Sequence, residues 1–205
     1  MMRFYILVFL FLGSMFSVIG QETTYQVIPV SGSAIDSARV MQLTKVQEPC
    51  TFMSVSEKSV VQWMNIARMY PKWFMKFKKI RNIDPIYTET LINSMMKMKP
   101  IKTKLIPNQK MWESAQCHVS TVGPLGKTGH DRVNTRCKLD INAECIHYGG
   151  GSADYKVKRL VVDRGVPSLG HRTAILDPKL KKVGVSQGPF GNDPQVIMTV
   201  IDFGR

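Results

Sequence analysis

Apolar residues recur every three to four positions over most of residues 54–120, which is the spacing of amphipathic helices. Ser54, followed three residues later by Glu57, forms a capping-box signature and predicts a helix through about residue 68. The same periodicity predicts three further helices, over residues 72–81, 86–98 and 107–119. Residues 54–120 are therefore expected to be helical.

Strand-like patterns appear only in the second half of the chain. Residues 143–149 form a short alternating run that ends in three glycines, and residues 182–187 and 195–203 predict two paired strands. A helix over residues 153–164 and a short one ending near Leu176 lie between them. This order of elements predicts an α/β layered domain with a small, mainly antiparallel central sheet.

Side chains of the strand predicted at residues 143–149 alternate between the two faces of the sheet. Alternation places Glu144, Ile146 and Tyr148 on one face and Cys145 and His147 on the other. We therefore expect Glu144 and His147 not to share a site.

The N-terminal residues predict export. Arg3, the apolar run at residues 4–12 and the small residue Gly20 together resemble a secretory signal peptide over residues 1–20. An uncleaved membrane anchor is the alternative. Residues 21–53 are polar without sustained periodicity and predict an extended arm, followed by one domain over residues 54–205. We expect a secreted protein, either extracellular or periplasmic.

Four cysteines remain after the predicted leader is removed, and an even number in an exported protein indicates disulfides. They are Cys50, Cys117, Cys137 and Cys145. Three pairings are possible. The sequence separation weakly favours Cys137–Cys145 with Cys50–Cys117, because the first pair closes a hairpin-sized loop.

The positive charge of the chain is local. Without residues 1–20 the chain has 27 Lys and Arg against 15 Asp and Glu, and residues 72–104 alone carry +7 of that +12. Such a segment can bind an anionic surface, or it can be a solvated face whose aromatic side chains belong to the core. No base-reading motif accompanies it, so sequence-specific nucleic-acid binding is not expected.

His171 is the first candidate for site chemistry. Gly165 can end one helix and Ser168 can cap the next, which places His171 in a first helical turn. The positive end of a helix disfavours a protonated imidazole, and the neutral ring is the form that binds a metal ion or accepts a proton. A simple hydrogen bond to a neighbouring loop is the alternative role.

Several segments, taken in order, resemble the CAP superfamily of cysteine-rich secretory, antigen 5 and pathogenesis-related proteins, in particular its microbial SCP-like extracellular branch. The resemblance covers about residues 57–204 and is strongest in the run GVPSLGHR at residues 165–172. Other matching segments are NIARMYP at 65–71, WESAQCH at 112–118, Gly129-His130, Glu144-Cys145-Ile146 and the final VIDF at 200–203.

The resemblance implies an α-β-α sandwich whose cleft holds two histidines and two acids. By position these are His130 and His171 with Glu144 and, less directly, Asp163. Such a set can bind Zn²⁺ or another divalent metal. Two departures suggest a remodelled site, since Ala143 and Cys145 flank Glu144 where the family has Gly and Asn.

The resemblance favours a monomeric, non-enzymatic binding module for a lipid-like or other small ligand. No nucleophile motif identifies catalytic residues. A metal-dependent hydrolase using the same cleft is the first alternative. An envelope or polyanion binder acting through residues 72–104 is the second, and a purely structural role for the four polar residues is also open.

Overall fold

The computed structural model describes residues 36–47, 49–76, 83–133, 137 and 140–205. These residues all belong to one compact unit, Gly32–Arg205. The predicted signal peptide, the first part of the predicted arm and the end of the helix expected over residues 72–81 lie outside the described residues.

The first half of the chain is helical, as predicted. Its helices are α1 Ser37–Thr44, α2 Val55–Met69, α3 Pro71–Lys76, α4 Pro85–Lys97 and α5 Gln109–Val122. The capping box at α2 is confirmed, because Ser54 and Glu57 each hydrogen-bond the backbone N–H of the other. Helix α1 was not predicted. Its buried Val40 joins the core, so residues 36–47 are folded rather than an extended arm.

The second half supplies most of the sheet. After the short helix η2 Gly123–Leu125 come β2 Ala143–Tyr148, α6 Ala153–Val162, α7 Gly170–Leu176, β3 Lys182–Phe190 and β4 Asp193–Gly204. A short strand β1, Ile106–Pro107, precedes α5. Both long strands extend further than predicted, which shortens the loop expected over residues 188–194 to a tight turn.

The predicted α/β class with a small sheet is confirmed. Among the described residues the sheet has four strands in the order β1-β3-β4-β2. Strand β4 pairs antiparallel with β2 and β3, whereas β1 runs parallel to β3 and makes the sheet mixed. Strand β2, which carries Glu144, is consequently an edge strand.

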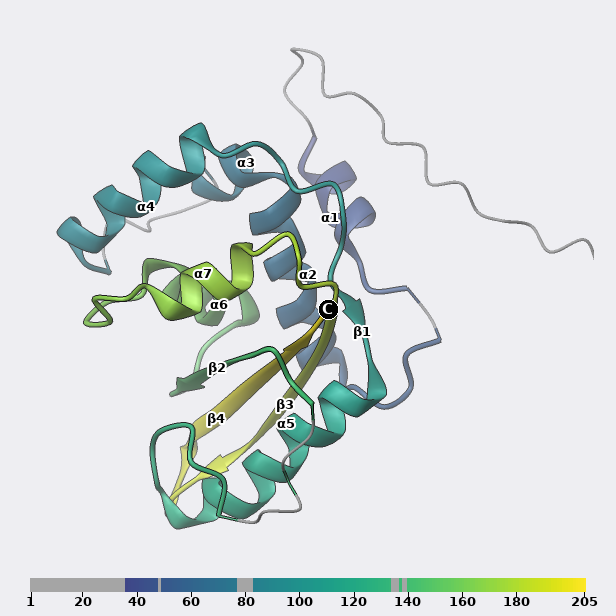
Figure 1. Cartoon of the computed structure of the whole chain (residues 1–205), viewed down its shortest axis with the longest axis vertical. Helices are drawn as coiled ribbons and strands as arrows, with labels where there is room; N and C mark the ends of the chain where they lie inside the picture. Colours follow the sequence, from purple (N-terminus) through teal and green to yellow (C-terminus); the bar gives the residue numbers. More distant parts are fainter. Residues whose placement is uncertain (1–35, 48, 77–82, 134–136, 138–139) are drawn as a thin grey trace, which may run out of the picture. The chain divides into compact units, whose positions relative to one another are not determined.

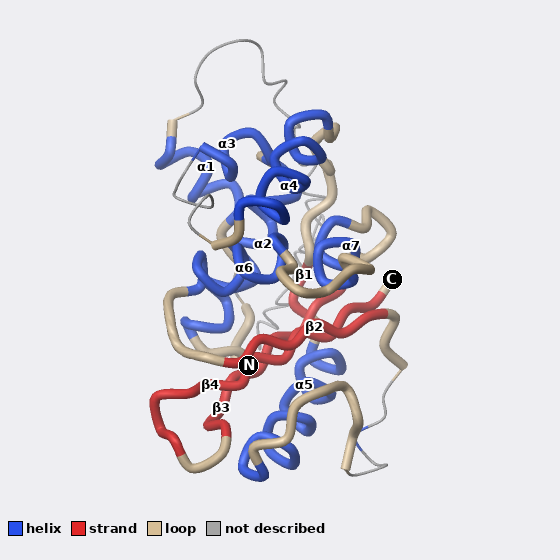
Figure 2. The backbone as a smooth tube through the Cα atoms, turned by 90° about the vertical axis from the view of Figure 1, so that its left-hand side faces the viewer, coloured by secondary structure: helices blue, strands red, loops and turns tan. Residues whose placement is uncertain are grey.

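Helices cover both faces of this sheet (Figure 1). Helix α5 packs against β3 and β4 on one face, and α2, α6 and α7 pack on the other, as Figure 2 shows from the side. Gly184 on β3 permits the close approach of α5, because a Cβ at this position would lie 1.9 Å from the backbone nitrogen of Trp112.

Two buried arginines hold the helix ends near the candidate site. The Arg68 guanidinium donates to the carbonyl oxygen of Ile175, in the last turn of α7, and to those of Asp177 and Leu180, just beyond this helix. The Arg172 guanidinium donates to the carbonyl oxygens of Val161 and Val162 at the end of α6. Helix ends leave carbonyl groups without intrahelical partners, so these side chains hold the C-terminal ends of α6 and α7 in place.

Candidate functional site

His130 and His171 lie close together although they are far apart in sequence. His130 comes from the loop after η2, and His171 is the second residue of α7. Their ring centroids are 6.5 Å apart and the rings are tilted by 36°. The His130 side chain is 58% exposed and that of His171 is 21% exposed, so both rings can be reached from solvent.

Glu144 on β2 orients the His130 ring. Its Oε1 lies 2.8 Å from Nδ1 of His130, and its Oε2 lies 2.9 Å from Nδ1 of the buried His118 on α5. Burial by itself raises the pKa of Glu144, but hydrogen bonds from His118 and His130 and the charge of Arg132 outweigh it and lower this pKa to about 2. The ionised carboxylate can only accept, so each histidine donates from Nδ1, and in the neutral ring Nε2 is then the acceptor.

Asp163 orients His171 in the same way. Its Oδ1 lies 2.6 Å from Nδ1 of His171, and its Oδ2 accepts the backbone N–H of Arg172 at 3.1 Å. Asp163 caps α6 in the left-handed region at φ 60°, where aspartate is tolerated better than most residues. The helix therefore ends at Asp163 rather than at the predicted Gly165.

The start of α7 also differs from the prediction. Ser168 makes no capping hydrogen bond, and the N-cap is Leu169, held in the left-handed region at φ 50°. Two non-glycine residues with positive φ, Asp163 and Leu169, thus lie at the two ends of the loop that joins α6 to α7. Such conformations cost free energy and persist only where the surrounding structure imposes them, often at functional sites.

A buried charge network supports Glu144 from the α5 side of the sheet. The Arg132 guanidinium bonds the carboxylate of Glu144 and donates to Asp202 Oδ2 at 3.0 Å and to the carbonyl oxygen of Ser114 at 2.6 Å. Glu144 and Asp202 are register partners on β2 and β4, so two carboxylates share one guanidinium. Burial, followed by repulsion from Glu144, raises the pKa of Asp202 to about 7.

Hydrogen bonding to Glu144 is also the main influence on His130. It raises the pKa of His130 above the ordinary value, and burial opposes that rise. The charge state of His130 therefore depends on the Glu144 carboxylate, which the buried network holds in place.

The loop that carries His130 is held by contacts on both sides of this residue. A disulfide joins Cys117 on α5 to Cys137, and the hydroxyl of Tyr148 accepts the backbone N–H of Gly129 at 2.8 Å. The favoured cysteine pairing was wrong, because Cys117 pairs with Cys137 and Cys145 is a buried thiol. Cys145 points away from Cys137, because it lies on the α7 side of β2 with its Sγ 3.8 Å from the carbonyl oxygen of His171.

All four predicted site residues contribute to one arrangement at the edge of the sheet. Glu144 faces α5 and Asp163 follows α6, so the two histidine–acid pairs approach over β2 from opposite faces of the sheet. The expected separation of Glu144 from His147 is confirmed, since the His147 ring lies against Tyr155 on the opposite face.

The sequence did not assign His118, Arg132 or Asp202 to the site. His118 was noted only as part of a motif, and its ring is fully buried under the sheet. Asp202 had a usable signal, because an acidic residue in the apolar run at 196–203 needs a buried partner. Arg132, which supplies that partner, lies in a loop without periodicity.

The arrangement leaves two imidazole nitrogens, Nε2 of His130 and Nε2 of His171, for an external ligand. Within the described part of the chain, no group of three or more His, Cys, Asp or Glu side chains is placed to hold a metal ion. Any ion held here would therefore rely on two imidazoles and take its remaining ligands from outside the protein.

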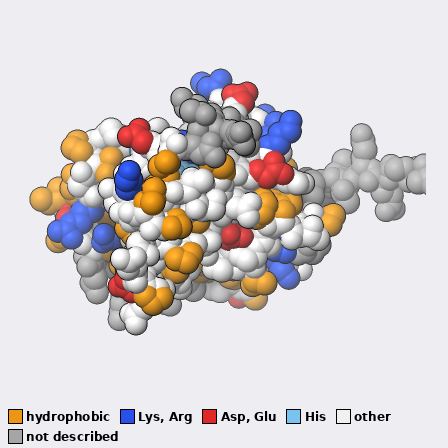
Figure 3. All heavy atoms as spheres, turned by 90° about the horizontal axis from the view of Figure 1, so that it is seen from below, with side chains coloured by type: hydrophobic (Ala, Val, Ile, Leu, Met, Phe, Trp, Pro, Cys, Tyr) orange, Lys and Arg blue, Asp and Glu red, His pale blue; other side chains and the backbone are white. Residues whose placement is uncertain are grey.

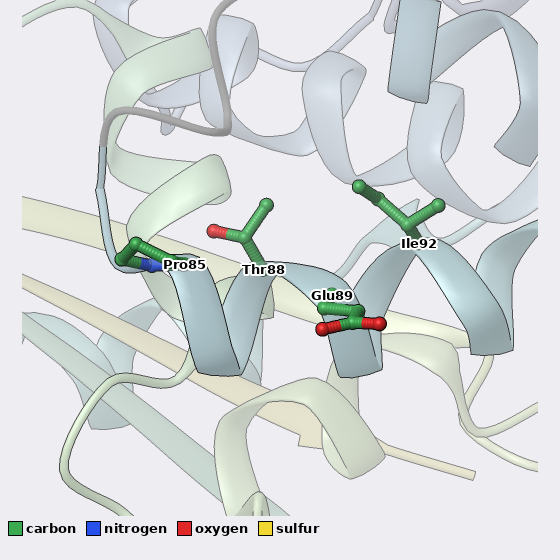
Figure 4. A pocket seen from close by; sticks show the side chains of 4 residues that line it. All are labelled: Pro85, Thr88, Glu89 and Ile92. Carbon is green, nitrogen blue, oxygen red and sulfur yellow. The ribbon is translucent and has the colours of Figure 1, made fainter.

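Other surfaces are separate from this site. A hollow on α4 is lined by Pro85, Thr88, Glu89 and Ile92 (Figure 4). In the basic segment 72–104, Phe74 is buried and Trp63 contacts both Trp73 and Phe74, so its described aromatics join the core. The exposed lysines in the described part of this segment are Lys72, Lys76, Lys97, Lys99 and Lys102. Figure 3 shows one face of the molecule, on which basic and acidic side chains are interspersed.

Comparison with protein-family models and with curated proteins finds no match for this chain. In the part of the chain that the structure describes, no helix is both long enough and apolar enough to span a bilayer.

Proposed function

We propose that this chain is an exported, monomeric binding module of the CAP type, in which His130 and His171 hold a divalent metal ion and a small ligand. The observation that carries this proposal is the pairing of each Nδ1 with its own carboxylate, at 2.8 Å and 2.6 Å. Histidines that bind metals commonly donate their other ring N–H to a carboxylate, which fixes the tautomer and the ring orientation.

The residues present fit such an ion. Neutral imidazole suits Zn²⁺, with metal–nitrogen distances of about 2.0–2.1 Å, and the rings are 6.5 Å apart between centroids. A shared ion needs the rings roughly 1 Å closer than this. The exposed His130 side chain can make that movement while Glu144 keeps hold of its Nδ1.

The ion would supply open coordination positions. Glu144 and Asp163 would keep the two Nε2 atoms directed at it, and the exposed side of the His130 ring would leave space for the ligand. A lipid-like or other small molecule with a metal-binding oxygen is the class of ligand that this site would take.

Export is supported by the disulfide bond. The Cys117–Cys137 disulfide is compatible with an oxidising compartment, outside the cell or in a periplasm. The CAP assignment is supported by the order of the matching segments and by a small sheet with helices on both faces. His130 and His171, which come from the matching segments, also lie close together, and Glu144 bonds the first of them.

Calorimetric titration of zinc into the mature chain tests the proposal. Wild type should bind one ion, and His130→Ala or His171→Ala should abolish binding. Thr128→Ala and Thr173→Ala are matched controls, because both threonines are exposed and lie two residues from a histidine. Asp163→Asn should weaken binding by roughly 10- to 100-fold, as expected for a residue that orients a metal ligand.

Two outcomes would change the assignment. Failure of wild type to bind zinc would leave the four polar residues as a structural network. Metal-dependent cleavage of a peptide, lipid or glycan that His171→Ala abolishes would make the protein a hydrolase.

A second candidate function is binding to an anionic surface. Its supporting observation is the set of five exposed lysines among the described residues of the segment 72–104. Sedimentation with anionic vesicles should then fall steeply with salt, because exposed charges are screened over about 10 Å at 0.1 M salt. Metal binding at the histidine pair should respond little to the same salt.

A further inference from the structure

A second polar cluster lies on the opposite face of β2 from Glu144. His147 is only 8% exposed, and its Nδ1 has no hydrogen-bond partner among the described residues. It pairs in register with Thr199 on β4, and its ring lies edge-on to Tyr155, 6.3 Å away between centroids. A buried polar atom without a partner is uncommon in folded proteins.

Lys156 reaches the same position from α6. Its side chain is almost entirely covered, at 4% exposure, and its Nζ lies 3.2 Å from the hydroxyl of Thr199. An ammonium group has three protons to donate, and Thr199 also receives a bond from the Gln187 side-chain amide. Within the described chain, no carboxylate lies within ion-pair distance of Lys156.

Arg159 adds a third basic group one helical turn further on. It is half-buried and makes no ion pair with any described acid. Burial is the main cause that lowers the pKa of His147 to about 4, and the charges of Lys156 and Arg159 contribute to the same shift. The region around His147 is therefore electropositive.

The acids on this side of the sheet already have partners. Asp154 is bonded by Lys158 at 3.1 Å and by the Ser152 hydroxyl. Both oxygens of Glu57 accept backbone N–H groups, from Ser54 and from Gln187. No described acid is left to balance Lys156 and Arg159, and a buried charge without an opposite charge is unfavourable.

The turn between β2 and α6 lies against this cluster. Gly149 has φ +125°, and a Cβ there would lie 3.6 Å from Cε1 of the His147 ring, so the glycine turn lies beside that edge of the ring. Tyr155, beside it in the first turn of α6, is 44% exposed. The N-terminus of α6 adds the positive end of a helix dipole.

We propose that His147, Lys156 and Arg159 form a binding site for a small oxyanion, either a phosphate or a carboxylate group. The oxyanion supplies the negative charge that Lys156 and Arg159 lack and accepts a hydrogen bond from the His147 ring. It enters beside Tyr155, at the glycine turn. This site is independent of the proposed metal ion, because it uses neither His130 nor Glu144.

Titration of the chelator-treated mature chain at low ionic strength tests this inference. Inorganic phosphate and acetate are titrated separately by calorimetry, and the anion that binds identifies the group. Lys156→Met should weaken binding at least tenfold. Lys158→Met is the matched control, because it removes the same charge from the same helix but from a lysine paired with Asp154, and it should stay within twofold of wild type.

Folding of Lys156→Met is checked by circular dichroism, and Arg159→Gln provides a second variant that removes a charge from a half-buried position. Loss of binding in both variants supports the oxyanion site. Binding of neither anion by wild type overturns it, as does equal affinity in wild type, Lys156→Met and Arg159→Gln. Because no metal is present, failure here leaves the metal proposal intact, and failure to bind zinc leaves this one intact.

Discussion

Replacing Arg132 by methionine should destabilise the fold more than any other change of a single surface-loop charge. The side chain lies in the loop after η2, yet its guanidinium is buried between Glu144 and Asp202. Methionine keeps much of the volume and removes only the charge and the hydrogen bonds. The variant therefore leaves two carboxylates facing each other across neighbouring strands.

The expected cost follows from the burial of all three groups. Removing one partner of a buried ion pair typically costs about 3–5 kcal/mol, because the remaining charge is left uncompensated. In a folded domain of this size that corresponds to a fall in melting temperature of roughly 10 °C. Protonation of Asp202 relieves part of the repulsion, so the cost should be smaller at pH 5.5 than at pH 8.

Urea denaturation followed by circular dichroism measures this cost. Arg164→Met is the matched control: Arg164 also pairs with an aspartate, Asp84 at 3.3 Å, but its side chain is 59% exposed. Exposed pairs contribute at most about 1 kcal/mol. Adding Asp202→Asn to Arg132→Met should recover part of the loss. Equal costs for the two arginine variants would refute the buried network.

Three further changes test other parts of the structure. Asp202→Asn should become more stable relative to wild type as the pH rises from about 4 to about 7. The pKa of Asp202 is raised in the folded state, so folding of the wild type takes up a proton in that pH range and loses stability as the pH rises. A difference in urea midpoints that does not change with pH would contradict this. Gly184→Ala should cost about 3 kcal/mol or more, since its Cβ would overlap the backbone of α5, and a melting temperature within 2 °C of wild type would show that α5 packs elsewhere. Replacing Cys117 and Cys137 by serine should cost about 3 kcal/mol by opening a 20-residue loop, and peptide mapping that links either cysteine to Cys145 would disprove the bridge.

The elements were predictable where local signals agree with the tertiary structure. The Ser54–Glu57 capping box and the apolar spacing that follows it define α2, and strand alternation placed Glu144 and His147 on opposite faces. Helix α1 was missed because its stability comes from burying Val40 against the rest of the core rather than from sustained periodicity. The end of α6 was misplaced because an aspartate adopts the left-handed conformation expected of Gly165.

The site was predictable only in part. His130, His171, Glu144 and Asp163 were assigned from motif order, and the structure brings them together at one edge of the sheet. Their buried support could not be assigned, because His118, Arg132 and Asp202 meet through strand pairing and a loop that carries no periodic signal. The cysteine pairing failed for a related reason: short sequence separation says nothing about the face of β2 to which Cys145 points.

The central claim is that the Nε2 atoms of His130 and His171 face one shared position. Nitrogen NMR of the histidine rings during a zinc titration tests this most directly, because ring nitrogens that bind the ion shift strongly. Shifts of Nε2 in His130 and His171 at one equivalent of zinc, with the rings of His118 and His147 unchanged, are the predicted result. A shift of only one of the two rings, or a shift of His147 in their place, would contradict the claim.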